Sequence, residues 1–176
     1  MHSRPLASRG RASGALLVLL GAWGALIPFV GPYFGYAYSP DKAWAYTSGR
    51  LFLSVLPGAL AFLGGLLVLG SEGAAAIGGF FAAVAGAWFV IGAEVMTIVP
   101  NGASYGPGTP VVTSGSVFSP ATMRLLEHIG FYSGLGVVIV FLGALALGKA
   151  AIARLAGGSD FAPGSAMEET QVGQSY

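Results

Sequence analysis

The sequence contains no cysteine and very little charge. Because none of its 176 residues is cysteine, disulfides, thiol redox chemistry, thiolate metal sites and lipid attachment through cysteine are excluded. Charged residues make up only 9% of the chain, against roughly 25% in a soluble domain. Eight basic residues face seven acidic ones, and this net charge of +1 gives no reason to expect a nucleic-acid partner. A fraction of charged residues as low as 9% is typical of an integral membrane protein.

Motifs for catalysis and cofactor binding are missing as well. The chain has two histidines, His2 and His128, and its serines lie mainly in predicted loops or tails. No nucleophile, base and acid occur at a useful spacing, and neither GxGxxG nor a P-loop pattern is present. The glycines follow helix-packing spacing instead. We therefore predict a protein that is not an enzyme and that holds no cofactor and no metal.

Hydrophobic residues, 55% of the chain, concentrate in four long apolar segments. About 20 apolar residues suffice to cross a bilayer. The predicted spans, within a domain covering residues 14–148, are 14–36, 50–70, 74–99 and 120–147. The third is free of charge until Glu94. The sequence predicts an all-α polytopic membrane protein, an antiparallel four-helix transmembrane bundle embedded in the lipid bilayer.

Basic residues indicate how this bundle is oriented. Those on one predicted side are Arg4, Arg9, Arg11, Lys149 and Arg154. Those of the two long loops and the adjoining helix ends are Lys42, Arg50 and Arg124. The excess of basic residues on the first side predicts a plasma-membrane protein with both termini cytoplasmic, the N-terminal one being a basic segment, 1–13. The cytoplasmic tail, 149–176, is predicted to be largely disordered from its composition. A cleaved signal peptide is the alternative for the first segment, but that run is long and contains two prolines.

The segments between the spans carry turn and interface signals. Residues 37–49 are polar and aromatic, as expected where a chain meets the membrane surface. The link Ser71–Gly73 is so short that spans two and three must form a hairpin. Residues 111–118 read as a short extracytoplasmic β-hairpin. Ser119 and Pro120 suggest the start of the fourth span, and Pro57 suggests a kink in the second.

Three short matches recur in the same order along the two halves of the chain. Gly21-Ala22-Trp23 is repeated as Gly86-Ala87-Trp88, Arg50-Leu51 as Arg124-Leu125, and Phe62–Gly70 resembles Phe141–Gly148. One interpretation is two repeated helical hairpins, related by an axis along the membrane normal. The other is chance, because segments built from Gly, Ala and Leu match one another easily. The sequence leaves both open.

A cluster of ionisable residues is predicted at the outer side of the bundle. Its candidate binding residues are Glu94, Arg50, Arg124, Glu127 and His128. Gly79, Ala83, Ala87 and Glu94 share one helical face, which we expect to look into the bundle. Two readings stay open, an ion-pair network between helices and a proton- or ion-binding polar pocket. A metal site formed by Glu94, Glu127 and His128 is a third arrangement, but it lacks the usual histidine spacing and is not predicted.

One segment of the chain resembles a known group of proteins. It runs from Gly21 to Leu51, GAWGALIPFVGPYFGYAYSPDKAWAYTSGRL, and is followed by Leu56-Pro57-Gly58. It resembles small uncharacterised four-span membrane proteins of actinobacterial type, a group that implies no established activity. The predicted function is therefore a non-enzymatic accessory or self-associating bundle, with another membrane protein or a second copy as partner. The alternative is a small transporter or ligand-binding protein with an outer pocket around Glu94.

Overall fold

The computed structural model describes residues 7–34, 43–98, 122, 126, 129–130 and 133–157, and these contain helices but no strands. The longer helices are α1 (Ala7–Val30), α3 (Leu56–Leu69), α4 (Glu72–Ile98) and α6 (Ser133–Gly157). The shorter ones are η1 (Gly31–Phe34), α2 (Ser48–Arg50) and the π-helix η2 (Leu51–Val55). The β-hairpin predicted at 111–118 lies outside the described residues.

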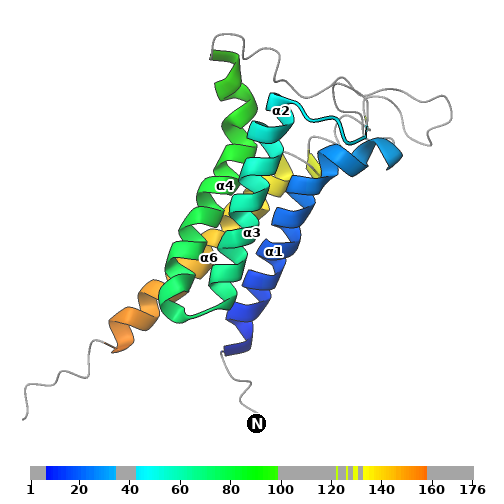
Figure 1. Ribbon diagram of the computed structural model, residues 1–176. Coiled ribbons are helices and arrows are strands. Elements are labelled where there is room, and N and C mark those ends of the chain that lie inside the picture. Colours follow the sequence, from blue (N-terminus) through cyan, green and yellow to red (C-terminus); the bar gives the residue numbers. More distant parts are fainter. Residues whose placement is uncertain are drawn as a thin grey trace, which may run out of the picture.

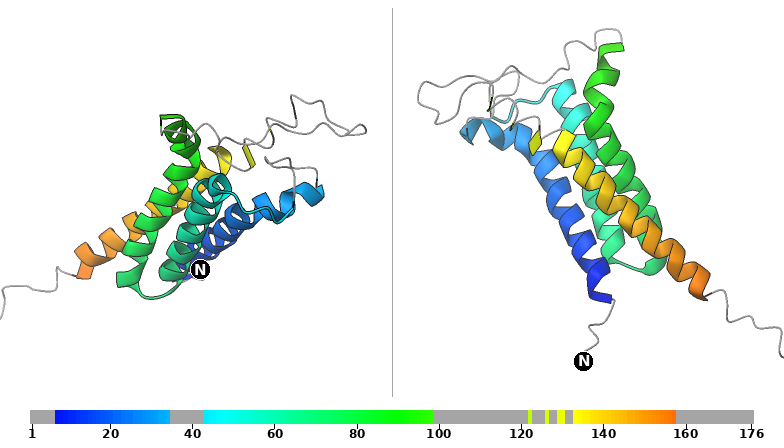
Figure 2. Two further views of the ribbon diagram at one scale, coloured as in Figure 1. Left: turned by 45° about the horizontal axis from the view of Figure 1, so that its top comes forward. Right: turned by 180° about the vertical axis from the view of Figure 1, so that it is seen from behind.

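The four long helices pack side by side (Figure 1). The chain ascends along α1, descends through α2, η2 and α3, ascends along α4 and descends along α6 (Figures 1 and 2). Each helix packs on the next, and α6 also contacts α1, which closes a ring. The start of α1 and the end of α6 lie at one end of the molecule. We call the opposite end, where α2 begins and α4 ends, the loop end.

Four helices are long and apolar enough to cross a membrane, as predicted. The candidate spans are Arg11–Tyr33, Ser48–Leu69, Gly73–Met96 and Ser133–Leu155. The last differs from the predicted 120–147, because α6 remains helical to Gly157. Of residues 120–132 the structure describes only 122, 126, 129 and 130; Thr122 and Leu126 are α-helical, and Ile129 and Gly130 are π-helical.

The core is built from small residues that let the helix backbones approach closely. A Cβ atom added to Gly86 would lie 2.7 Å from the carbonyl oxygen of Gly136, where α4 meets α6. One added to Gly21 would lie 2.8 Å from the carbonyl oxygen of Gly58, where α1 meets α3. Larger side chains such as Phe89 fill the centre of the bundle. Close backbone approach through glycine is the usual way in which membrane helices pack.

One predicted helix face is wrong in part. Gly79 is buried and Ala83 is partly buried, but Ala87 and Glu94 are exposed. The buried stripe of α4 instead continues from Gly79 through Gly86. At about 3.6 residues per turn each step of four rotates the face by about 40°, so Ala83 and Ala87 move off the contact line. The step of seven from Gly79 to Gly86 rotates it by only about 20°. Glu94, predicted to face the interior of the bundle, therefore lies on its surface.

Candidate functional site

The second span contains a local break in its helical hydrogen bonding. In η2 the N–H of Leu56 donates to the carbonyl oxygen of Leu51, five residues earlier. The carbonyl of Phe52 would next receive the N–H of residue 57, but residue 57 is proline and has none. The π turn and the proline together therefore deprive Phe52 of its donor within the helix. Short π turns are frequently found at functional positions.

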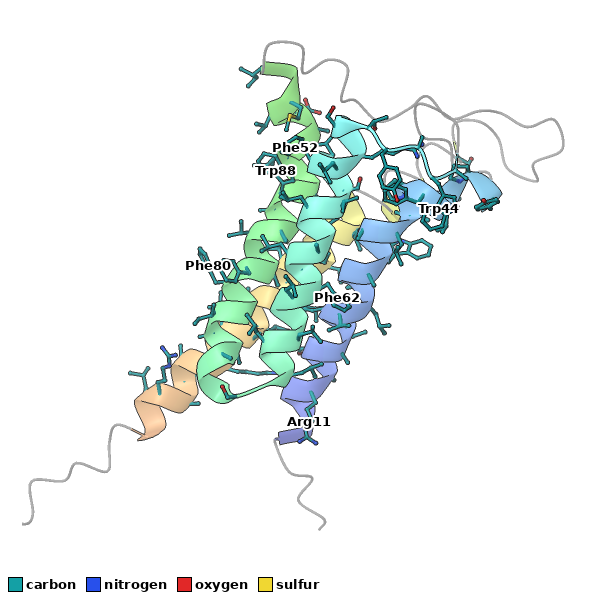
Figure 3. All side chains as sticks on the ribbon, viewed as in Figure 1. Arg11, Trp44, Phe52, Phe62, Phe80 and Trp88 are labelled. Carbon is teal, nitrogen blue, oxygen red and sulfur yellow. The ribbon has the colours of Figure 1, made fainter. Side chains whose placement is uncertain are left out.

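Trp88 of α4 supplies the missing donor. Its indole Nε1 lies 2.9 Å from the carbonyl oxygen of Phe52, and Figure 3 shows the two residues side by side. A buried or membrane-embedded carbonyl without a donor costs free energy, so this bond stabilises the π turn. Trp88 thus ties α4 to the start of the second span.

Trp23 of α1 makes a similar bond. Its Nε1 lies 3.4 Å from the carbonyl oxygen of Gly130. Gly130 is itself in a π-helical turn, the described pair 129–130, shortly before α6. Both tryptophans of the repeated Gly-Ala-Trp motif therefore donate to a carbonyl in a π turn of another helix.

Arg50 is buried at the loop end, immediately before η2. Only 5% of it is exposed. Its Nη1 donates to the carbonyl oxygen of Ala45 at 3.0 Å, and its backbone N–H donates to Oγ1 of Thr47 at 3.3 Å, which caps α2. Arg50 makes a further interaction as well. A buried cation of this kind is retained only where hydrogen bonds replace its hydration.

An aromatic cluster covers the loop end beside Arg50. The ring of Phe29 lies 5.7 Å from that of Trp44 and 5.2 Å from that of Tyr46, measured between centroids. Phe29 is buried, whereas Trp44 and Tyr46 are 53% and 81% exposed. Trp44 adopts a φ of 60°, the left-handed region that non-glycine residues rarely occupy. Amphipathic rings in this position suit a boundary between apolar and aqueous surroundings.

The predicted polar cluster is only partly within the described structure. Arg50 is buried and Glu94 is exposed, while Arg124, Glu127 and His128 lie outside the described residues. Among the residues that the structure describes, no three His, Cys, Asp or Glu side chains gather as they would around a metal. The metal reading also needed Glu127 and His128, so it stays untested.

The hydrogen bond between Trp88 and Phe52 is not predicted from the sequence. In the sequence the repeated Gly-Ala-Trp and Pro57 are separate signals, with nothing to connect them. Their connection depends on a backbone carbonyl, which no side-chain pattern reveals. No family model, curated protein or solved structure was found to match the chain.

Proposed function

We propose that the chain is an integral membrane protein that crosses the bilayer four times as an antiparallel bundle. The exposed surface of its four helices carries this proposal. Only 33% to 44% of each candidate span is buried inside the molecule. The outward positions hold large apolar side chains, for example Leu19 at 66%, Phe80 at 55% and Phe141 at 61% exposed. Figure 3 shows Phe80 projecting away from the bundle. Apolar surface on every side is stable in lipid and costly in water.

The proposed orientation places both termini in the cytoplasm and the loop end outside the plasma membrane. The excess of basic residues near the termini supports it. Reporter fusions in a bacterial host test it. Alkaline phosphatase joined after Ser71 is expected to be inactive, and joined after Gly115 active. An active fusion at Ser71 or an inactive one at Gly115 contradicts the orientation.

The proposed role is that of a non-enzymatic accessory or self-associating bundle. Within the described residues the buried polar side chains are Ser13, Arg50 and Ser54, a set without a carboxylate or an imidazole. The buried glycines Gly79 and Gly86 of α4 already pack against α6 of the same chain. A partner would therefore dock on the outward apolar faces rather than on these glycines.

Purification in a mild detergent tests this role. Native mass spectrometry of the full chain is expected to show a complex larger than one chain, either with a second copy or with another membrane protein. A strictly monomeric protein with no co-purifying partner contradicts the proposal. The alternative of a transporter or ligand-binding pocket around Glu94 stays open, because Glu94 is exposed on α4 and its predicted neighbours Arg124, Glu127 and His128 lie outside the described residues.

A further inference from the structure

The contacts within the first helical hairpin, α1 with α3, recur within the second, α4 with α6. A Cβ on Gly14 would lie 3.1 Å from the carbonyl oxygen of Gly65, and one on Gly79 would lie 2.8 Å from that of Gly143. A single register relates them. It advances the first helix by 65 residues, from Gly14 to Gly79, and the second helix by 78, from Gly65 to Gly143.

The same register carries the next contact and the lipid-facing positions. It takes Gly21 to Gly86 and Gly58 to Gly136, the two closest approaches described above. Residues that are equivalent in this register also have similar exposed fractions. The equivalent pair Leu26 and Ile91 are each 51% exposed, and the pair Leu63 and Phe141 are 55% and 61% exposed.

The two tryptophan bonds also obey this register. It takes Trp23 to Trp88 and Phe52 to Gly130. Each bond runs from the first helix of one hairpin to the second span of the other. A reciprocal exchange of this kind is what a two-fold rotation between the hairpins produces.

A rotation axis must pass where a residue meets its own equivalent. Gly24 and Phe89 are equivalent in this register, and a Cβ on Gly24 would lie 2.6 Å from Cζ of the Phe89 ring. The small residue on α1 and the large one on α4 thus share one space at the centre of the bundle.

The symmetry is broken at one helix interface for a simple steric reason. A Cβ on Gly64 of α3 would lie 2.6 Å from the carbonyl oxygen of Gly78 in α4. The equivalent of Gly64 in α6 is Leu142, a buried residue with a much larger side chain. Accordingly α6 packs less extensively on α1 than α3 packs on α4.

We propose that the two π turns are equivalent hinges of a duplicated hairpin, each latched by the tryptophan indole of the other hairpin. With the latch closed, Trp88 satisfies the carbonyl of Phe52 and holds the start of the second span against α4. When it releases, the segment above η2 turns away from α4. That movement uncovers Ser54, which is 2% exposed, and Arg50 beside it.

The absence of cysteine gives a direct test on the full chain in detergent. Ser54→Cys places a single thiol of similar size inside η2. Trp88→Phe keeps the aromatic ring but removes the N–H. We expect it to raise the maleimide labelling rate of the Ser54→Cys thiol roughly five- to tenfold, the effect of losing one hydrogen bond. Trp44→Phe is the matched control, because Trp44 contacts Phe29 instead.

Hydrogen exchange tests the reciprocity. Trp88→Phe should accelerate exchange in peptides covering η2, and Trp23→Phe in peptides covering Gly130, each in the hairpin that the mutation does not touch. Pro57→Ala restores an N–H for the carbonyl of Phe52. In that background Trp88→Phe should change the labelling of Ser54→Cys less than it does in the wild type.

Three results would overturn the proposal. One is labelling of Ser54→Cys that rises no more in Trp88→Phe than in Trp44→Phe. Another is exchange that accelerates only within the mutated hairpin. The third is an undiminished effect of Trp88→Phe in the Pro57→Ala background. Ser71→Cys, an exposed position, should label equally in every variant and reports on the reagent. If Trp88→Phe yields no folded protein, Pro57→Ala provides the test instead. Because it gives the carbonyl of Phe52 a second donor, the Ser54→Cys thiol must label no faster in Pro57→Ala than it does with Pro57 in place.

Discussion

Gly86 and Gly136 face each other across α4 and α6 with no side chain between them. A Cβ on Gly86 would lie 2.7 Å from the carbonyl oxygen of Gly136, and a Cβ on Gly136 would lie 2.6 Å from that of Gly86. Real Cβ atoms essentially never come this close to a backbone oxygen. The two backbones therefore lie too close together for a side chain at either position.

Gly86→Leu is expected to be strongly destabilising for this reason. The new side chain meets backbone atoms, which cannot rotate aside, so the free energy of unfolding should fall by about 3 kcal/mol or more. Gly148→Leu is the matched control, since nothing lies within 4 Å of a Cβ at that position of α6. The thermal midpoint of each variant in detergent measures the difference. Equal midpoints would mean that α4 and α6 do not pack as described.

Gly24→Ala is expected to cost less than Gly21→Ala. A Cβ on Gly21 meets the backbone of Phe62, whereas a Cβ on Gly24 meets the end of the Phe89 ring, which can move. Shortening that ring in the double variant Gly24→Ala/Phe89→Leu should restore part of the midpoint lost in Gly24→Ala. The same change, Phe89→Leu, should give Gly21→Ala no such relief. Rescue of both, or of neither, argues against the central pairing of Gly24 with Phe89.

Arg50→Gln is expected to lower the thermal midpoint. The change removes a buried donor and leaves the carbonyl of Ala45 without it, at a cost of about 1–3 kcal/mol. Arg11→Gln removes an exposed arginine at the opposite end of the molecule and should have little effect. Thermal unfolding of both variants in detergent gives the comparison. A variant at position 50 as stable as that at position 11 would show that the buried guanidinium contributes little.

Glu94→Gln is expected to leave stability nearly unchanged. A buried ion pair would lose about 3–5 kcal/mol when one partner is neutralised, but Glu94 is exposed. An exposed carboxylate contributes roughly 1 kcal/mol or less. A large drop in the midpoint of Glu94→Gln would contradict this expectation and show that the carboxylate takes part in an ion pair.

Hydropathy sufficed to predict four spans and the short link after the second, because length and apolar content determine both. It did not determine which face of α4 is buried. Residues 73–87 contain glycine or alanine at most positions, so several faces look equally suited to close packing. The spacing predicts burial of the stripe that ends at Ala87 and Glu94, but the stripe through Gly86 is the one that is buried.

The repeated matches were informative in part. The Gly-Ala-Trp match has the register of the helix contacts. The match of Phe62 with Phe141 differs from that register by one residue, because the helix contacts make Gly65, not Gly64, the equivalent of Gly143. The match of Arg50 with Arg124 is a turn out of it. Leu-rich and Gly-rich segments align with themselves at several shifts, and only backbone contacts select one.

The position of the closest glycine contacts has a consequence for how the molecule is made. Gly14 meets Gly65 and Gly21 meets Gly58, all within the first seventy residues, so this pair of helices can zip together while the ribosome is still translating the rest. The indole of Trp23, by contrast, waits for Gly130. Like the contact of Gly79 with Gly143, this bond can form only after the second hairpin has been synthesised, so it joins the two hairpins at a later stage of biogenesis.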